Sequence, residues 1–306
     1  MSRVDNFDGY KVPFPALTPG QRLFLEVNGY VVIENTLNDD ETGRMLEALQ
    51  RLKRQFEAAD DPEAHRVNGC QVVKLEPCFA SFSHILETDP ACLEYLTHRR
   101  LVGLAEELVG GRVRLEESAA IINSRDPKVP VGTDFRYGFH RGSQPGLDSY
   151  IYDDLTHCLY VKTLTNLTEL GPDDGGTAVI AGSHKLNCDG DDLVQAAYAD
   201  PSLIHQVVAP AGSTLLFAET LIHASGPVRS DRERTIIIGG YSHPKSMAMK
   251  GQQPSGEFLA ALPEHLQELI AGKPLWTWPE RHRTLGMAAG MDDVPYRARM
   301  WSVLNA

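Results

Sequence analysis

Residues 213–242 of the chain read STLLFAETLIHASGPVRSDRERTIIIGGYS. Two apolar runs in this stretch, 213–218 and 234–242, have the length of strands, and residues typical of turns separate them. The second run begins at Arg234 and continues with three isoleucines. A buried arginine at the start of such a strand needs an anionic partner, and a bidentate carboxylate would satisfy it. The stretch therefore predicts β structure that carries a positive charge into the interior.

Short alternating stretches of the same kind fill the chain between residues 112 and 243. The other expected strands are 112–123, 134–141, 155–168, 177–181 and 204–208. Turn sequences separate them, for example Gly171-Pro-Asp-Asp-Gly-Gly176 and Ala209-Pro-Ala-Gly212. Many short strands with regularly placed turns predict a sandwich or a jelly-roll barrel over residues 112–243.

The patterning on either side of this core is helical. Residues 1–111 are expected to be mainly helical, after an arm over 1–18 that is rich in Pro, Asp and Gly. The expected features are helix starts at Thr18-Pro19, at Asn38 or Asp39 and near Asp89-Pro90, a helix over 101–108 that ends at Gly110-Gly111, and a short strand over 30–33. Residues 244–306 are expected to form a C-terminal helix and a tail. The order of elements predicts one α+β domain over residues 1–306.

The composition is that of an ordinary globular chain. It has 306 residues, 42% of them hydrophobic, and 29 basic against 41 acidic side chains, which gives a net charge of −12. This balance argues against nucleic acid or an anionic membrane as partner, and no apolar run approaches the ~20 residues of a membrane span. Five scattered cysteines without a CxxC pair, and a start without an apolar leader, predict a cytoplasmic protein. Nothing in the sequence indicates an oligomeric state.

Two histidines lie on or beside expected strands. They are in Phe139-His140-Arg141-Gly142 and Leu221-Ile222-His223-Ala224-Ser225, and Arg234 follows His223 by eleven residues. Two imidazoles with an open face suit a catalytic iron, zinc or copper ion. A zinc or cupin-like protein and a pure binding module are competing classes. The first does not call for an arginine at that spacing, and the second does not call for a pair of inward histidines.

Four segments, taken in order, resemble the phytanoyl-CoA dioxygenase family of the non-heme Fe(II)/2-oxoglutarate-dependent oxygenases. They are Gly29-Tyr-Val-Val-Ile-Glu-Asn35, Leu101-Val-Gly-Leu-Ala-Glu-Glu-Leu-Val-Gly110, Asp173-Asp-Gly-Gly-Thr-Ala-Val-Ile-Ala-Gly-Ser-His-Lys185, and the series His223, Ser225 and Arg234. The resemblance covers about residues 18–243 and implies a double-stranded β-helix, which is a jelly roll with flanking helices. This fold agrees with the strands expected above.

The resemblance also implies roles for individual residues. His140 and His223 match the two iron-binding histidines, Arg234 matches the arginine that holds the distal carboxylate of 2-oxoglutarate, and Ser225 matches a polar neighbour of it. The implied cofactors are Fe(II) and 2-oxoglutarate, and the implied partners are dioxygen and a small-molecule substrate whose aliphatic C–H bond is oxidised. The substrate in the family's name is not assigned to this chain, because a shared fold does not determine the substrate.

Gly142 departs from the family's pattern, which is His-X-Asp with the aspartate as third iron ligand. Replacement by Gly or Ala marks the halogenase members of the superfamily, in which chloride takes the vacated position. Chloride would preserve the charge at the iron, so halogenation is one hypothesis. Another is a hydroxylase that takes a carboxylate from Asp148, or from Asp134, Asp153 or Asp154. A third is a degenerate, non-catalytic metal-binding protein.

Two further polar residues are candidates for the pocket. Lys162 lies among apolar neighbours on the expected strand 155–168, where an unpaired charge would be expensive to bury. It is expected either to contact 2-oxoglutarate or an acidic substrate group, or to pair with a carboxylate at the rim. Asn123 ends an expected strand and is assigned to the same pocket, whereas His157 and His184 are expected to have core and turn roles.

Overall fold

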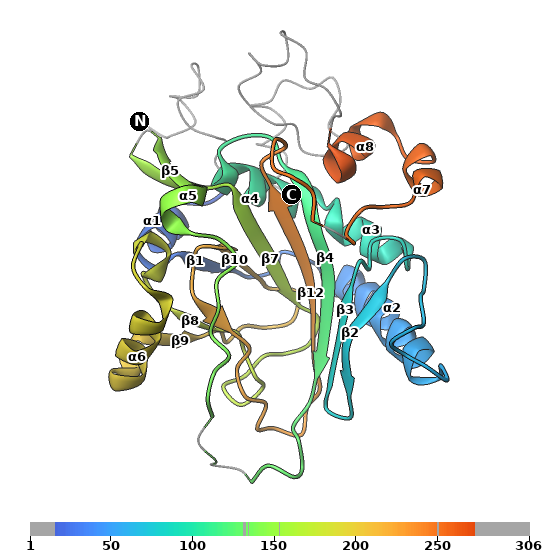
Figure 1. The fold of residues 1–306 in the computed structure, drawn as a ribbon, viewed down its shortest axis with the longest axis horizontal. Helices are drawn as coiled ribbons and strands as arrows, with labels where there is room; N and C mark the ends of the chain where they lie inside the picture. The colour runs from blue at the N-terminus through green and yellow to red at the C-terminus, as the bar shows by residue number, and fades with distance from the viewer. Residues whose placement is uncertain (1–15, 131–132, 134, 153, 250, 273–306) are drawn as a thin grey trace.

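The computed structural model describes residues 16–130, 133, 135–152, 154–249 and 251–272 (Figure 1). Its helices are α1 (Pro19–Asn28), α2 (Asp39–Glu57), α3 (Pro90–Leu96), α4 (Arg99–Val109), α5 (Pro145–Asp148), α6 (Gly190–Ala199), α7 (Gly256–Ala260) and α8 (Glu264–Ala271). Its strands are β1 (Tyr30–Ile33), β2 (Gln71–Glu76), β3 (Phe79–Ser83), β4 (Arg114–Asn123), β5 (Ser149–Tyr152), β6 (Leu155–Cys158), β7 (Tyr160–Asn166), β8 (Ala178–Ile180), β9 (Ile204–Gln206), β10 (Thr214–Ala218), β11 (His223–Ala224) and β12 (Arg234–Ser242). The α+β class is confirmed.

The strands form two main sheets. The large sheet has the order β1-β10-β7-β12-β4-β3-β2, the small sheet has the order β11-β8-β9, and β5 and β6 make a separate hairpin. All the pairings are antiparallel. The two main sheets share a buried core, which is the predicted jelly-roll arrangement, although in the described part of the chain they do not close into a barrel.

The N-terminal helices begin and end where the sequence predicts. Thr18 and Gln21 form a capping box at α1, and Asn38 and Glu41 form another at α2. Gly110 ends α4 in the left-handed conformation that glycine adopts without strain. Of these helices, α2 and α4 pack against the large sheet.

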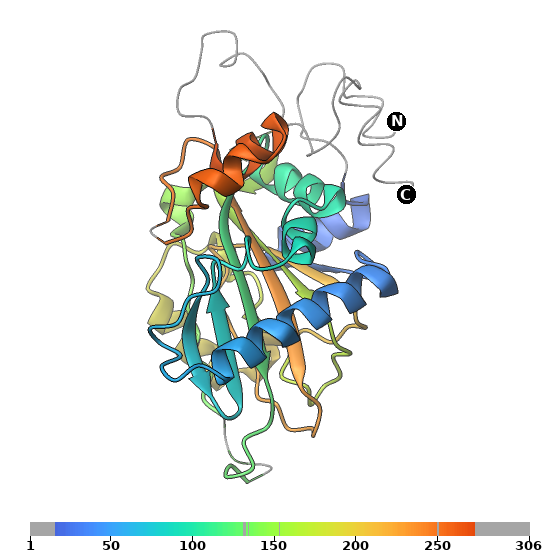
Figure 2. The same cartoon turned by 90° about the vertical axis from the view of Figure 1, so that its right-hand side faces the viewer.

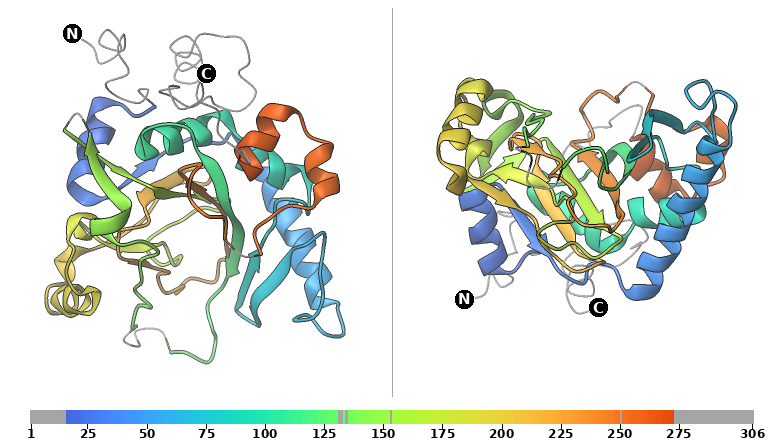
Figure 3. Two further views of the ribbon diagram at one scale, coloured as in Figure 1. Left: turned by 45° about the horizontal axis from the view of Figure 1, so that its top comes forward. Right: turned by 90° about the horizontal axis from the view of Figure 1, so that it is seen from below.

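The central strands of the large sheet are buried on both faces. Its outer face packs against α2, α3 and α4, and Figure 2 shows α2 running across it. Its inner face packs against the small sheet, and Figure 3 shows α6 beside the small sheet, on the opposite side of the molecule from α2. Ile237 of β12 belongs to the outer core, whereas Ile236 and Ile238 belong to the inner one. The uninterrupted isoleucine run in β12 follows from this double burial.

One expected strand is different in the structure. Of the described residues in the range 134–141, only His140 forms a bridge, and its partner is His223. The alternating aromatic side chains of Phe135, Tyr137 and Phe139 pack on one another, with ring centroids about 5 Å apart. The amide of Tyr137 donates to the hydroxyl of Tyr198 in α6. The alternation therefore reflects an extended segment that packs against a helix and does not join a sheet.

Two expectations from composition can be compared with the structure. No helix in the described residues is long and apolar enough to cross a membrane. The cysteines at 70, 78, 92, 158 and 188 all have free thiols. The arm over 1–15 and the tail from 273 onward lie outside the described residues.

Candidate active site

His140 and His223 lie side by side between the two sheets. Their backbones form an antiparallel bridge, in which each amide donates to the other residue's carbonyl at 3.0 and 2.9 Å. Their ring centroids are 4.4 Å apart. The topology thus unites two residues that are far apart in the sequence, as their expected role as a metal-binding pair requires.

Both rings have the same orientation. Nδ1 of His140 lies 3.0 Å from the carbonyl of Gly138, and Nδ1 of His223 lies 2.9 Å from the carbonyl of Leu221. A carbonyl can only accept, so in both rings Nδ1 is the donor to the carbonyl and Nε2 is the nitrogen left for another partner. Burial and the neighbouring His140 lower the pKa of His223 to about 3. His223 is therefore a neutral donor, the form that binds a metal ion.

A carboxylate that the sequence analysis did not single out stands beside this pair. Glu219 follows β10 and is 1% exposed. Its Oε1 lies 3.9 Å from Nε2 of His223 and 3.0 Å from Nζ of Lys162. Burial raises the pKa of Glu219, and Lys162 opposes this rise. The site therefore contains a carboxylate, which the His140-Arg-Gly142 sequence lacks.

Gly142 marks how close this carboxylate comes. A Cβ atom on Gly142 would overlap Oε2 of Glu219 and lie 3.1 Å from its Cδ. The amides of Gly142 and Ser143 both donate to the main-chain carbonyl of Glu219, at 3.0 and 3.2 Å. The space that a side chain at 142 would use is therefore filled by Glu219.

Lys162 projects from β7 toward Glu219 and is held by two carboxylates. Its Nζ lies 3.1 Å from Glu117 and 3.0 Å from Glu219. Burial would lower the pKa of Lys162, but these two charges outweigh burial and raise it. Tyr160 donates to Glu117 at 2.6 Å and extends the chain of polar contacts. Lys162 thus belongs to an ion-pair network inside the cavity.

Arg234 is buried at the start of β12, as its sequence context predicts, and is 2% exposed. One Nη donates to Thr177 at 3.1 Å, while Nε and the other Nη have no hydrogen-bond partner among the described residues. Burial lowers the pKa of Arg234 to about 10. A buried cation with unused donors requires an anion to complete it, and a carboxylate matches its fork.

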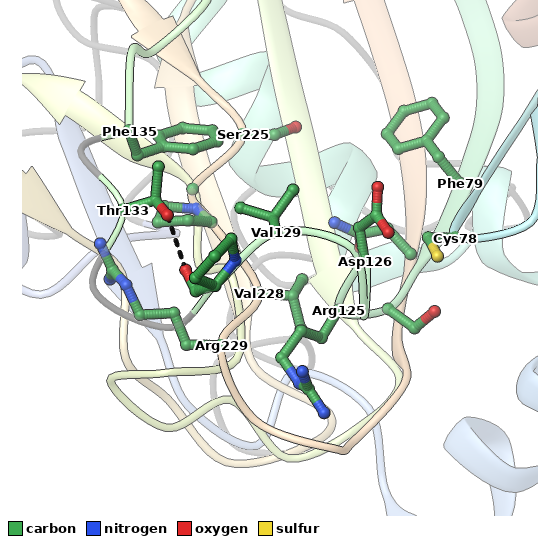
Figure 4. A pocket seen from close by; sticks show the side chains of 15 residues that line it. Cys78, Phe79, Arg125, Asp126, Val129, Thr133, Phe135, Ser225, Val228 and Arg229 are labelled. Atoms are coloured by element: carbon green, nitrogen blue, oxygen red, sulfur yellow. Dashed lines mark hydrogen bonds between the residues drawn. The ribbon is translucent and has the colours of Figure 1, made fainter.

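Two cavities lie near this arginine, and Asn123 and Ser225 are among the residues that line them. Asn123 is paired with Arg234 across β4 and β12, and its buried Oδ1 also lacks a partner among the described residues. A cavity of about 280 Å³ contains His140, His223, Lys162, Thr177 and Ser225. A second cavity, of about 300 Å³, begins at Ser225 and Asn123. In Figure 4, Phe79, Val129 and Phe135 surround this second cavity together with Ser225.

The carboxylates proposed from the sequence lie in other places. Asp148 accepts a hydrogen bond from the amide of Gln144 at 2.9 Å and is half-buried at the end of α5. Asp154 is exposed in a turn with a positive φ of 62°. Asp134 and Asp153 lie outside the described residues. No group of three His, Cys, Asp or Glu side chains in the described part of the chain already has metal-binding geometry.

The remaining candidate histidines lie in the core. His157 is fully buried and stacks on Tyr150 at 5.2 Å. His184 is buried against Gly29, whose Cβ position its ring would overlap. Its neighbour Ser183 accepts a hydrogen bond from the amide of Ile222 at 2.9 Å. The Gly-Ser-His step therefore fixes the strand that carries His223.

The residues present fit a metal ion and an organic diacid. Two imidazoles line a cavity that also contains Thr177, the hydrogen-bond partner of Arg234, and the carboxylate of Glu219 lies 3.9 Å from Nε2 of His223. This donor set is that of a non-heme metal site with an anionic cosubstrate. It defines the class of protein, which is a jelly-roll metalloenzyme.

Comparison with known proteins identifies the family. The model of the phytanoyl-CoA dioxygenase (PhyH) family matches residues 25–236. This chain therefore belongs to that family of non-heme iron, 2-oxoglutarate-dependent oxygenases. A search of curated proteins finds no match.

Solved structures agree on the fold. HygX from Streptomyces hygroscopicus, with nickel and 2-oxoglutarate bound, aligns at a TM-score of 0.56 with 20% identity, over 74% of this chain and 87% of HygX. EctD from S. alaskensis, with bound Fe, aligns at 0.58 with 19% identity, over 77% and 80% of the two chains. The carbocyclase SnoK from nogalamycin biosynthesis aligns at 0.56 with 17% identity, over 87% and 96%. At these identities the likeness concerns the fold.

Proposed function

We propose that this chain catalyses the Fe(II)- and 2-oxoglutarate-dependent oxidation of an aliphatic C–H bond in a small molecule. The observation that carries the proposal is the pair of histidine rings 4.4 Å apart, both bonded through Nδ1 to a carbonyl, in a cavity near a buried arginine with unused donors. A zinc protein would use the histidines but leave Arg234 without a partner.

Each residue has a role in binding. His140 and His223 would hold the iron through Nε2, and the fork of Arg234 would hold the distal carboxylate of 2-oxoglutarate. Ser225 and Asn123 lie where they would contact the same cosubstrate or the substrate beyond it. Bound iron, together with 2-oxoglutarate and dioxygen, supplies the oxidising power for C–H cleavage.

The protein orients the reactants and excludes water. Phe217 packs against His223 with ring centroids 4.7 Å apart, and Leu164, Ile236 and Ile238 line the same cavity. The adjoining cavity of about 300 Å³ has mainly apolar walls and would take the substrate. Bound hygromycin B in one HygX structure supports a small-molecule substrate for this fold.

Two outcomes of the oxidation compete. Gly142 favours halogenation, because a glycine leaves a ligand position that chloride can take. The carboxylate of Glu219 beside Gly142 favours hydroxylation, since it fills that space and would repel an anion. We propose hydroxylation as the main outcome and keep halogenation as the second candidate. A degenerate protein would leave the unused donors of Arg234 unexplained.

The proposal is tested by succinate formation from 2-oxoglutarate in the presence of Fe(II), ascorbate and oxygen. The His223→Ala variant is expected to lower the iron-dependent rate to background, because one of two imidazole ligands is lost. His205→Gln is the matched control, since His205 bonds Tyr30 outside the cavity. Unchanged turnover in His223→Ala would refute the iron assignment.

We also propose a cytoplasmic location. The five free thiols support it, because cysteines persist unpaired in reducing compartments.

A further inference from the structure

The clearest departure of this site from its family's pattern is the glycine at 142. The side chain of Glu219 fills the space beside this glycine. The carboxylate of Glu219 occupies the position at which a side chain on residue 142 would begin. An aspartate there would place its own carboxylate in the same region. Glu219 therefore brings to this position, from another strand end, the chemical group that the glycine lacks.

Backbone geometry fixes Glu219 in this place. Residues 140–143 run antiparallel to 219–223, joined by the His140–His223 bridge at one end and by the two amides that donate to the carbonyl of Glu219 at the other. The amide of Glu219 itself donates to the carbonyl of Tyr160 at 3.0 Å. One short antiparallel segment thus carries both histidines and the carboxylate.

The charge of Glu219 also requires a cation. A buried carboxylate is costly unless it is paired. Lys162 lies 3.0 Å from its Oε1 and pairs on its other side with Glu117. Two carboxylates around one lysine leave one negative charge over in the cavity. A divalent cation on the two histidines would offset this excess negative charge.

We propose that Glu219 is the third protein ligand of the metal that His140 and His223 hold, with Lys162 as the residue that positions it. The inference rests on the function proposed above. Two ligands at right angles, each about 2.1 Å from a metal, are ~3 Å apart. Oε1 of Glu219 is 3.9 Å from Nε2 of His223. Metal binding is therefore expected to draw the carboxylate in by ~1 Å.

The consequence is a closed halide site. A carboxylate in this position supplies the charge that chloride would otherwise bring, and it takes up the space as well. A carboxylate ligand from Glu219 would thus explain how a chain with a His-X-Gly sequence transfers oxygen and not chloride. It also assigns Lys162 to the support of a ligand, and not to 2-oxoglutarate.

The test is metal binding by the full-length protein, measured by titration with Co(II) or Ni(II) without oxygen. Glu219→Gln is expected to weaken binding about 10- to 100-fold. Glu117→Gln is the matched control, because it removes the other carboxylate on Lys162 and leaves Gly142 untouched. If Glu219 served only to neutralise Lys162, the two variants would lose the same affinity, and the inference would be wrong.

Rescue separates loss of a ligand from loss of the fold. The double variant Gly142→Asp with Glu219→Ala moves the carboxylate to the family's position and is expected to bind within about threefold of the wild-type protein. Gly142→Asp alone is expected to bind no better than wild type, because its new side chain overlaps Glu219. Failure of the double variant to rescue, in a protein that melts like wild type, would overturn the inference.

Chloride gives an independent readout. The visible spectrum of the Co(II) protein is expected to ignore chloride in the wild type and to shift with chloride in Glu219→Ala, where the position is open. A chloride response in the wild type would contradict the proposal. His140→Ala separates failure of the proposed function from failure of the Glu219 inference. If both His140→Ala and Glu219→Gln retain full metal affinity, the proposed function is wrong. If only Glu219→Gln retains it, only the assignment of Glu219 as third ligand is wrong.

Discussion

The two faces of the large sheet both bury polar groups, but they treat them differently. On the outer face, the hydroxyl of Tyr95 contacts Thr163, Thr165 and the carbonyl of Ile237, at 3.0 to 3.2 Å. On the inner face, Arg234 and Asn123 keep polar atoms without a partner in the described residues. The polar groups around Tyr95 form hydrogen bonds with one another and stabilise the fold. Those of Arg234 and Asn123 are complete only when a ligand is added, which distinguishes a site from a structural network.

The largest expected effect is on the inner face. Arg234→Met should weaken 2-oxoglutarate binding about 100-fold, or ~3 kcal/mol, because a charge-assisted fork is lost. The melting temperature of the ligand-free protein should stay the same or rise, since a buried cation with unused donors is removed. Calorimetric titration with 2-oxoglutarate and a thermal melt measure the two quantities. A lower melting temperature with unchanged affinity would reverse the comparison.

A pH effect of similar size is expected from the buried core histidines. Burial lowers the pKa values of His157 and His184 to about 4, with Arg22 and Lys185 respectively adding to the shift and Glu26 opposing it. The unfolded chain, with a histidine pKa near 6.5, binds protons first. The stabilisation is therefore complete above about pH 6.5 and is lost as the pH falls toward 4, by up to ~3 kcal/mol per histidine.

Denaturant unfolding between pH 7 and 4.5 measures this loss. His157→Gln should flatten the pH dependence by about one proton, because one of the histidines whose pKa burial lowers is removed. A variant with the same slope as wild type would show that His157 does not carry the effect. These histidines lie away from the cavity, so the loss belongs to the fold alone.

The smallest expected effect is on the outer face. Tyr95→Phe should lower the free energy of unfolding by ~1–3 kcal/mol, because a buried hydroxyl with several partners is lost. The affinity for 2-oxoglutarate should not change. Urea unfolding and the same calorimetric titration test both parts. Loss of cosubstrate binding without loss of stability would mean that the two faces are coupled.

Much of the fold could be predicted because local patterns are strong. The caps at Thr18 and Asn38, the glycine stop at 110 and the isoleucine run in β12 all lie where expected. Strands β2 and β3 could not be recognised in this way. Half of the β2 residues are exposed, and a register shift interrupts its pairing with β3, so no clean alternation marks the hairpin.

The site could be predicted only where a residue type and its motif coincide. His140, His223 and Arg234 are predicted from their place on or beside expected strands and from the family resemblance, and the structure brings the two histidines together and buries the arginine. Glu219 was missed because its relation to Gly142 depends on the pairing of segments 77 residues apart, which the chain's order does not display. One signal did exist: a lysine at 162 among apolar residues needs a carboxylate, and Glu219 is one of the two that pair with it.

The overlap between Glu219 and the missing Cβ of Gly142 also has an evolutionary consequence. The two positions compete for one volume and one charge, so neither can change freely while the other is kept. An aspartate at 142 would require a shorter side chain at 219, and the proposed ligand role of Glu219 would then pass to residue 142. A search that demands His-X-Asp would discard this chain, although under the proposal its third carboxylate ligand comes from another position in the sequence.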